Sequence, residues 1–132
     1  MPVTIPTLAR AVSLKRIAAV VAFGTLMLGS GQAQDAAAGK TVFVQCAACH
    51  SIDGATNVGP TLKGIDGRKA GSVAGFRYSR AMKNAGFNWD EQKLDAYIAD
   101  PQKVVPGNVM PFSGLPEARQ RADLVAYLKT LK

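Results

Sequence analysis

Two cysteines and a histidine stand close together at residues 46–50, in the run Cys46-Ala47-Ala48-Cys49-His50. A Cys-x-x-Cys-His run is the pattern through which a haem is attached covalently to a protein. Two thiols three residues apart can reach the two vinyl groups on one edge of a porphyrin, and the adjacent imidazole can then ligate the iron from below. The spacing therefore predicts one haem c, attached through Cys46 and Cys49, with His50 as an iron ligand.

Three other kinds of site could use the same residues. A zinc site usually needs four protein ligands, and His50 is the only histidine, so a carboxylate would have to complete the set. A thioredoxin-like redox pair needs a preceding strand in a βαβ context, and none is visible in the sequence. A disulfide between Cys46 and Cys49 would close a very short loop and contribute little stability. A haem-free metal or disulfide module therefore stays only as an alternative.

The first 33 residues have the features of an export signal. Two basic residues precede an apolar run at residues 17–28, which is far shorter than the roughly 20 residues that span a bilayer. Small residues up to Ala33 favour cleavage before Gln34. We therefore expect a signal peptide at residues 1–33 and a periplasmic domain at residues 34–132, with no stable membrane insertion after cleavage. An uncleaved membrane anchor is the alternative.

The charge of the remaining chain is modest. Removal of the leader takes away three basic residues, so 13 of the 16 Lys and Arg residues remain against 9 Asp and Glu. These positive charges are scattered among acidic residues and are not grouped with aromatic residues, as a nucleic-acid groove would require. We expect a single-domain monomer that does not bind nucleic acid.

The pattern of apolar residues predicts an all-α domain that begins with a helix. Asp35 is a suitable N-cap for this helix, and Gly39, Val42, Phe43 and Cys46 fall on one of its faces. That face would carry the haem attachment. Gly39 has no side chain beyond its hydrogen and would let a second helix cross closely.

Loops and two further main helices are expected after the cysteines. Residues 51–74 are rich in glycine, which predicts a long loop that can wrap a cofactor, and residues 79–84 predict a short helical turn. A second main helix follows, with Asn88 as its N-cap, and Pro101 stops it. The third runs over about residues 116–131, and its leucine stripe needs a partner, most simply the first helix.

A methionine is the candidate for the second axial ligand of the iron. Of the two methionines beyond residue 33, Met82 lies in a helical-looking stretch that suits packing. Met110 lies between Pro106 and Pro111, which restrict the backbone and favour a fixed loop. A thioether there suits iron and favours its reduced state, so we predict His50 and Met110 as the two metal ligands.

From about Gly39 to Lys132 the chain resembles the class I cytochromes c, and it looks most similar to the small soluble bacterial members of the periplasm. The resemblance implies the cytochrome c fold, in which three main helices and long loops surround one covalently bound haem. It rests on six stretches of sequence: Cys46–His50, Val58–Leu62, Gly67–Lys69, Asn88-Trp89, Pro106–Met110 and Leu124–Leu128.

The resemblance also implies roles for residues around the haem. The carbonyl of Pro60 would accept a hydrogen bond from the second ring nitrogen of His50 and so fix the orientation of the ligand. Buried haem propionates need hydrogen-bond donors, because burial of an unpaired charge is costly. By resemblance, such donors are supplied by Arg68, Tyr78 and Trp89. The resemblance also implies that Tyr97 lies near the Met110 sulfur and that Phe112 packs in the haem crevice.

Several positions depart from the family pattern. Met82 stands where many relatives carry asparagine, and Asn108 stands where threonine is common. Lys103 keeps one of the lysines that ring the exposed haem edge in mitochondrial relatives. Four other such positions have lost their lysine: Gln102, Val109, Pro116 and Glu117. We therefore expect association with partners to depend less steeply on salt than in a lysine-ringed relative.

The function implied by this resemblance is electron transport and not catalysis. The iron would take one electron from a membrane quinol-oxidising complex and give it to an oxidase, a reductase or a photosynthetic reaction centre of a respiratory or photosynthetic chain. With both axial positions filled, no substrate binds the iron. A haem peroxidase or gas sensor, in which Met110 is displaced, is the alternative.

Overall fold

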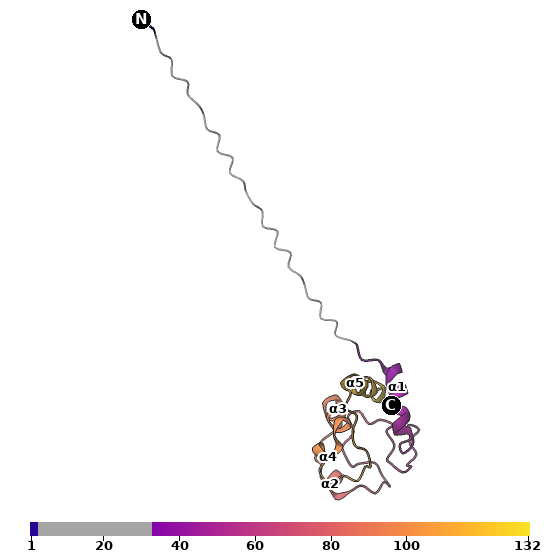
Figure 1. Ribbon diagram of the computed structural model, residues 1–132. Helices are drawn as coiled ribbons and strands as arrows, with labels where there is room; N and C mark the ends of the chain where they lie inside the picture. Colours follow the sequence, from indigo (N-terminus) through magenta and orange to yellow (C-terminus); the bar gives the residue numbers. More distant parts are fainter. Residues whose placement is uncertain (3–32) are drawn as a thin grey trace. The chain divides into compact units, whose positions relative to one another are not determined.

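The computed structural model describes residues 1–2 and 33–132, and within them it contains helices but no strand (Figure 1). The predicted signal peptide at residues 1–33 lies almost entirely outside the described residues, so its prediction is untested. None of the described helices is long and apolar enough to cross a membrane. The helices are α1 (Ala36–Ala47), α2 (Arg80–Lys83), α3 (Glu91–Ala99), α4 (Pro101–Val104) and α5 (Ala118–Lys129).

The first helix begins where the sequence predicted. The Asp35 carboxylate accepts hydrogen bonds from the amides of Ala37 and Ala38, at 2.8 and 3.2 Å, and so satisfies two donors at the start of α1. Gly39 and Phe43 are buried, while Val42 and Cys46 are half-buried against the core. The predicted apolar face of α1 is confirmed.

Helices α1 and α5 lie side by side, and the C-terminus ends next to α1 (Figure 1). A Cβ atom on Gly39 would overlap the backbone carbonyl of Asp123 and would lie 2.9 Å from the Cβ of Tyr127. Glycine is therefore needed for the two helices to approach this closely. Next to this crossing, the rings of Phe43 and Tyr127 pack with their centroids 5.3 Å apart. The predicted pairing of the first and last helices is confirmed.

The long loop and the short helix after it also follow the prediction. Residues 51–74 contain no helix and no strand, and a single antiparallel bridge joins Lys69 to Asn88. The short helix α2 starts at Ser79, whose hydroxyl accepts a hydrogen bond from the amide of Met82 at 3.1 Å. Met82 is buried, as its predicted packing role requires.

The second main helix begins later than predicted and ends, as predicted, before Pro101. Its N-cap is Asp90, whose carboxylate accepts a hydrogen bond from the Lys93 amide at 2.7 Å, and not Asn88. Asn88 does not start the helix, because the amide and the carbonyl of the next residue, Trp89, are hydrogen-bonded to Arg68 and Gly67. Pro101 does end α3, but it also occupies the first turn of α4, which the sequence did not predict. A proline is tolerated there because the first amides of a helix have no partner within it.

The last helix is shorter than expected. It begins at Ala118, where Glu117 acts as N-cap, and ends at Lys129. Its buried residues face both α1 and α3 and form the centre of the core. The most deeply buried of the described side chains are Leu124, Val125 and Pro101.

Candidate functional site

The two cysteines lie at the C-terminal end of α1, where the helix passes into a turn. The amides of Cys49 and His50 both donate to the carbonyl of Cys46, at 3.1 and 2.9 Å, so residues 46–50 form one tight hydrogen-bonded turn. Both thiols are free and half-buried. Burial, and then the neighbouring Cys49, raises the pKa of the Cys46 thiol. The structure thus holds two unpaired thiols beside one imidazole on a rigid turn.

The orientation of the His50 ring is set by the loop that follows. Nδ1 of His50 lies 2.7 Å from the carbonyl oxygen of Pro60. Because a carbonyl can only accept, Nδ1 must carry the proton, which leaves the lone pair of Nε2 for a metal. This is the contact that the family resemblance implied for Pro60.

Gly59 supports the same ring, a role that the sequence did not predict. A Cβ atom on Gly59 would lie 2.6 Å from Cε1 and 2.7 Å from Nδ1 of His50, so only glycine leaves room for the imidazole. The amide of Gly59 also donates to the carbonyl of Cys49 at 2.7 Å. A glycine directly before the predicted acceptor Pro60 was the one available signal in the sequence.

Met110 lies on a loop that is fastened to α4. Its amide donates to the side-chain oxygen of Asn108 at 3.0 Å, and its carbonyl accepts from the amide of Phe112 at 2.9 Å. Met110 and Phe112 are half-buried and pack against the core. The loop therefore presents the thioether from a fixed backbone, as the flanking prolines predicted.

The predicted propionate donors Arg68 and Trp89 are brought together by the backbone. The amide of Trp89 donates to the carbonyl of Arg68 at 2.8 Å. The Arg68 guanidinium donates to the carbonyls of Lys63 and Thr61, at 2.8 and 2.7 Å, and burial lowers its pKa. Two of the five guanidinium N–H groups thus fix the loop, and the other three remain able to donate to a propionate.

The third predicted donor is Tyr78, which lies in the segment just before α2. Its hydroxyl oxygen accepts a hydrogen bond from the Val73 amide at 3.3 Å, so its own proton remains free to be donated. Burial raises the pKa of Tyr78, which keeps this proton in place at neutral pH. The Phe76 ring packs edge-on against the Tyr78 ring at 4.7 Å.

Tyr97 belongs to an aromatic cluster between α3 and the preceding loop. Its ring packs edge-on against Trp89 at 5.0 Å, and Trp89 packs in the same way on Phe87 at 4.9 Å. Burial raises the pKa of Tyr97 to about 12, so the phenol is neutral under any physiological condition. The structure therefore joins Arg68, Trp89 and Tyr97 into one connected group.

The donor set and its surroundings fit a covalently attached haem. Two free thiols can form thioethers, the oriented Nε2 of His50 and the Met110 thioether are groups that can ligate iron, and Tyr78 and Arg68 have N–H or O–H groups left to donate to propionates. The porphyrin ring of a haem is large and apolar, so it also needs apolar neighbours. Several side chains touch the core yet stay partly exposed, as such neighbours would: Leu62, Ala81, Ala85, Phe87, Ile98, Val104 and Phe112. In residues 33–132, no three His, Cys, Asp or Glu side chains are grouped to hold a metal ion.

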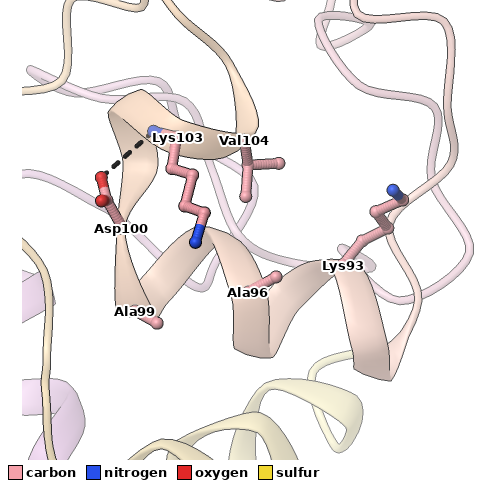
Figure 2. A pocket seen from close by; sticks show the side chains of 6 residues that line it. All are labelled: Lys93, Ala96, Ala99, Asp100, Lys103 and Val104. Carbon is pink, nitrogen blue, oxygen red and sulfur yellow. Dashed lines mark hydrogen bonds between the residues drawn. The ribbon is translucent and has the colours of Figure 1, made fainter.

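An open hollow lies where α3 passes into α4 (Figure 2). It is lined by two lysines, Lys93 and Lys103, by small apolar residues and by Asp100, whose carboxylate accepts a hydrogen bond from the Lys103 amide at 3.1 Å. None of the predicted haem-contacting residues lines it.

Comparison with known proteins gives consistent results. The cytochrome c family model matches residues 36–132. The chain is 46% identical over 113 residues to cytochrome c2 of Blastochloris viridis, an alignment that covers 81% of this chain and 89% of that protein. It is 52% identical over 98 residues to the cytochrome c-type cyt cy of Rhodobacter capsulatus, which covers 74% of this chain but only 49% of the relative.

A solved structure is also similar. Cytochrome cH from Methylobacterium extorquens superposes with a TM-score of 0.70 at 46% identity, over 73% of this chain and 98% of that one.

Proposed function

Since this chain belongs to the cytochrome c family, we propose that it is a periplasmic one-electron carrier between a membrane quinol-oxidising complex and an oxidase, a reductase or a photosynthetic reaction centre. It carries one haem c through Cys46 and Cys49 and, like its cytochrome c2 relatives, is an electron carrier and not an enzyme. The observation that supports the proposal best is the orientation of His50 by Pro60, which leaves Nε2 as the one ring nitrogen able to ligate.

The haem supplies the Fe(III)/Fe(II) couple, and the chain supplies a rigid frame around it. His50 is held by the 46–50 turn, by the face of Gly59 and by the Pro60 carbonyl. Met110 is held by its loop on α4. His50 and Met110, both held in place, would ligate the iron with little movement between its two oxidation states, which suits rapid electron transfer. With both side chains bound, no iron position would remain for a substrate.

The proposed periplasmic location rests on two observations. The N-terminal residues have the charge and apolar pattern of a signal peptide. The similar proteins include bacterial cytochromes c2 and cH. Export is also required by the chemistry, because in bacteria the attachment of haem to thiols takes place outside the cytoplasm.

The proposed partners are membrane redox complexes that bind briefly. A small interface permits fast release after the electron has passed. Val58 and Val109 are among the most exposed apolar side chains of the described residues, at 71% and 73%, and Val109 stands where mitochondrial relatives carry lysine. We propose that apolar contact contributes more, and lysine charge less, to this interface than in those relatives.

The test compares two volume-conserving variants of the purified, haem-loaded protein. Met110→Leu should lose the weak red sulfur-to-iron absorption band and should bind cyanide readily, whereas Met82→Leu should keep the band. A haemochrome assay should find one haem that stays with the denatured chain. A wild type with a vacant axial position at neutral pH would overturn the assignment of Met110 as a ligand and favour a peroxidase or a gas sensor.

The pathway is tested with membranes. Ferric protein should be reduced by membranes in which quinol is oxidised, and ferrous protein should be oxidised by membranes that contain an oxidase, a reductase or a reaction centre. Failure to exchange electrons with any such membrane would refute the proposed partners.

A further inference from the structure

We infer that Gln102 and Asn108 are positioning residues for Met110, forming a two-sided amide clamp that fastens the 106–110 loop to α4. This inference rests on the proposed role of Met110 as an iron ligand. Both residues are departures from the family pattern, since Gln102 stands at a lysine position and Asn108 at a threonine position. We define the clamp as the side chains of these two residues.

Asn108 forms the buried half of the clamp. Only 6% of its surface is exposed. Its Nδ2 donates to the carbonyls of Pro101 and Val105, at 2.9 and 3.0 Å, and its Oδ1 accepts from the Met110 amide at 3.0 Å. Both donors of the amide and its acceptor are thus used. One side chain connects the two ends of α4 directly to the backbone of the residue that bears the thioether.

Gln102 forms the exposed half. From the first turn of α4, its Oε1 accepts from the amide of Gly107 at 3.1 Å and its Nε2 donates to the carbonyl of Asn108 at 2.9 Å. The side chain therefore spans the backbone of the loop two residues before Met110. A lysine at this position has donors but no acceptor and could not hold the Gly107 amide.

The clamp replaces the backbone contacts that the loop lacks. Pro106 and Pro111 have no amide hydrogen, so they cannot fasten the loop by donating. Gly107 has a φ of 86° and would otherwise add freedom to the backbone. The side-chain amides of Gln102 and Asn108 hold the amides of Gly107 and Met110, the residues on either side of the Asn108-Val109 pair. Loss of these bonds should let the thioether move away more often.

The experiment uses the mature, haem-loaded ferric protein, two substitutions of Gln102 and a matched control at Gln92. Gln102→Met keeps length and removes both hydrogen bonds, Gln102→Glu keeps only the acceptor, and Gln92→Met makes the same change at an exposed position of α3. Two quantities are measured: the protection of the Gly107 amide against hydrogen–deuterium exchange, and the rate at which cyanide replaces the Met110 thioether at pH 7.

For Gln102→Met we expect about a tenfold loss of Gly107 protection and about a tenfold faster reaction with cyanide, because two hydrogen bonds to the loop are lost. Gln102→Glu should keep the Gly107 protection. Gln92→Met should leave both quantities unchanged. Asn108→Asp, which loses the donors to Pro101 and Val105, should speed the cyanide reaction further.

Two results would overturn the inference. One is a Gln102→Met protein with wild-type protection and wild-type cyanide kinetics. The other is an equal change in Gln92→Met, which would indicate general destabilisation. Failure of the proposed function has a different signature, since wild-type protein would then lack the red sulfur-to-iron band before any substitution is made.

Discussion

Replacement of Gly59 by alanine tests how the His50 ring is held. The added Cβ would lie 2.6 Å from Cε1 and 2.7 Å from Nδ1 of the ring, whereas carbon atoms in contact stand about 3.6 Å apart. The ring must therefore retreat by about 1 Å. A retreat of that size carries Nδ1 from 2.7 Å to more than about 3.5 Å from the Pro60 carbonyl, where no hydrogen bond remains.

The cost follows from these distances. Loss of the hydrogen bond removes about 1 kcal/mol, and overpacking costs about 1–3 kcal/mol, so the free energy of unfolding should fall by about 2–4 kcal/mol. The reduction potential should rise as well, because the Pro60 carbonyl makes His50 a stronger donor and so favours the ferric state. Guanidinium unfolding of the ferric protein and a redox titration measure the two effects.

Gly64→Ala is the matched control. Nothing lies within 4 Å of its added Cβ, but its φ of 65° makes alanine strained, at about 1–2 kcal/mol. This variant should lose stability and keep the wild-type potential. If Gly59→Ala keeps both the wild-type unfolding midpoint and the wild-type potential, the account of the His50 support is wrong.

Four further predictions concern the frame and the surface. Gly39→Ala should lower the free energy of unfolding, measured with guanidinium, by about 3 kcal/mol, because the added Cβ would push α5 away from α1. A variant with wild-type stability would contradict the close crossing. Burial raises the pKa of Tyr97 to about 12, so as the pH rises the unfolded chain releases this proton before the folded chain does. The urea midpoint of the wild type should therefore fall between about pH 10 and 12, and the midpoint of Tyr97→Phe should not. Hydrogen bonds from the Asp35 amide and then from Arg119 lower the pKa of Asp123. The stability that this carboxylate contributes is therefore present above about pH 4 and is lost as the pH falls below that value. In Asp123→Asn the urea midpoint should fall less steeply at acid pH than in the wild type. Stopped-flow association with a membrane partner should slow only weakly as ionic strength rises, and a steep fall would refute the reduced role of lysine.

The parts of the fold that were predicted correctly depend on local chemistry. Asp35 caps α1 because a carboxylate beside free amides is favourable in any context. Gly39 marked a close helix crossing, and Leu124 and Leu128 marked a buried stripe. Each of these signals is complete within a few residues of sequence.

The errors arose where distant residues compete. Asn88 has the chemistry of an N-cap, but the backbone of Trp89 is hydrogen-bonded to Gly67 and Arg68 in the preceding loop, so Asp90 caps the helix instead. Helix α4 is one turn long and lies beyond a proline, so it has no apolar period to detect.

The candidate site shows the same division. The cysteine and histidine spacing was sufficient to predict the attachment. The supporting roles of Gly59, Gln102 and Asn108 were missed, because they depend on which atoms the fold brings within hydrogen-bond or contact distance.

The crossing of α1 and α5 has a consequence for the order of events during biosynthesis. The two helices come from opposite ends of the domain, so α1 has no helix to pair with until residues 118–129 have been made. Until α5 packs, the face of α1 that carries Cys46 stays uncovered. Covalent attachment of the haem can therefore come before α5 packs against α1, and this packing completes the fold.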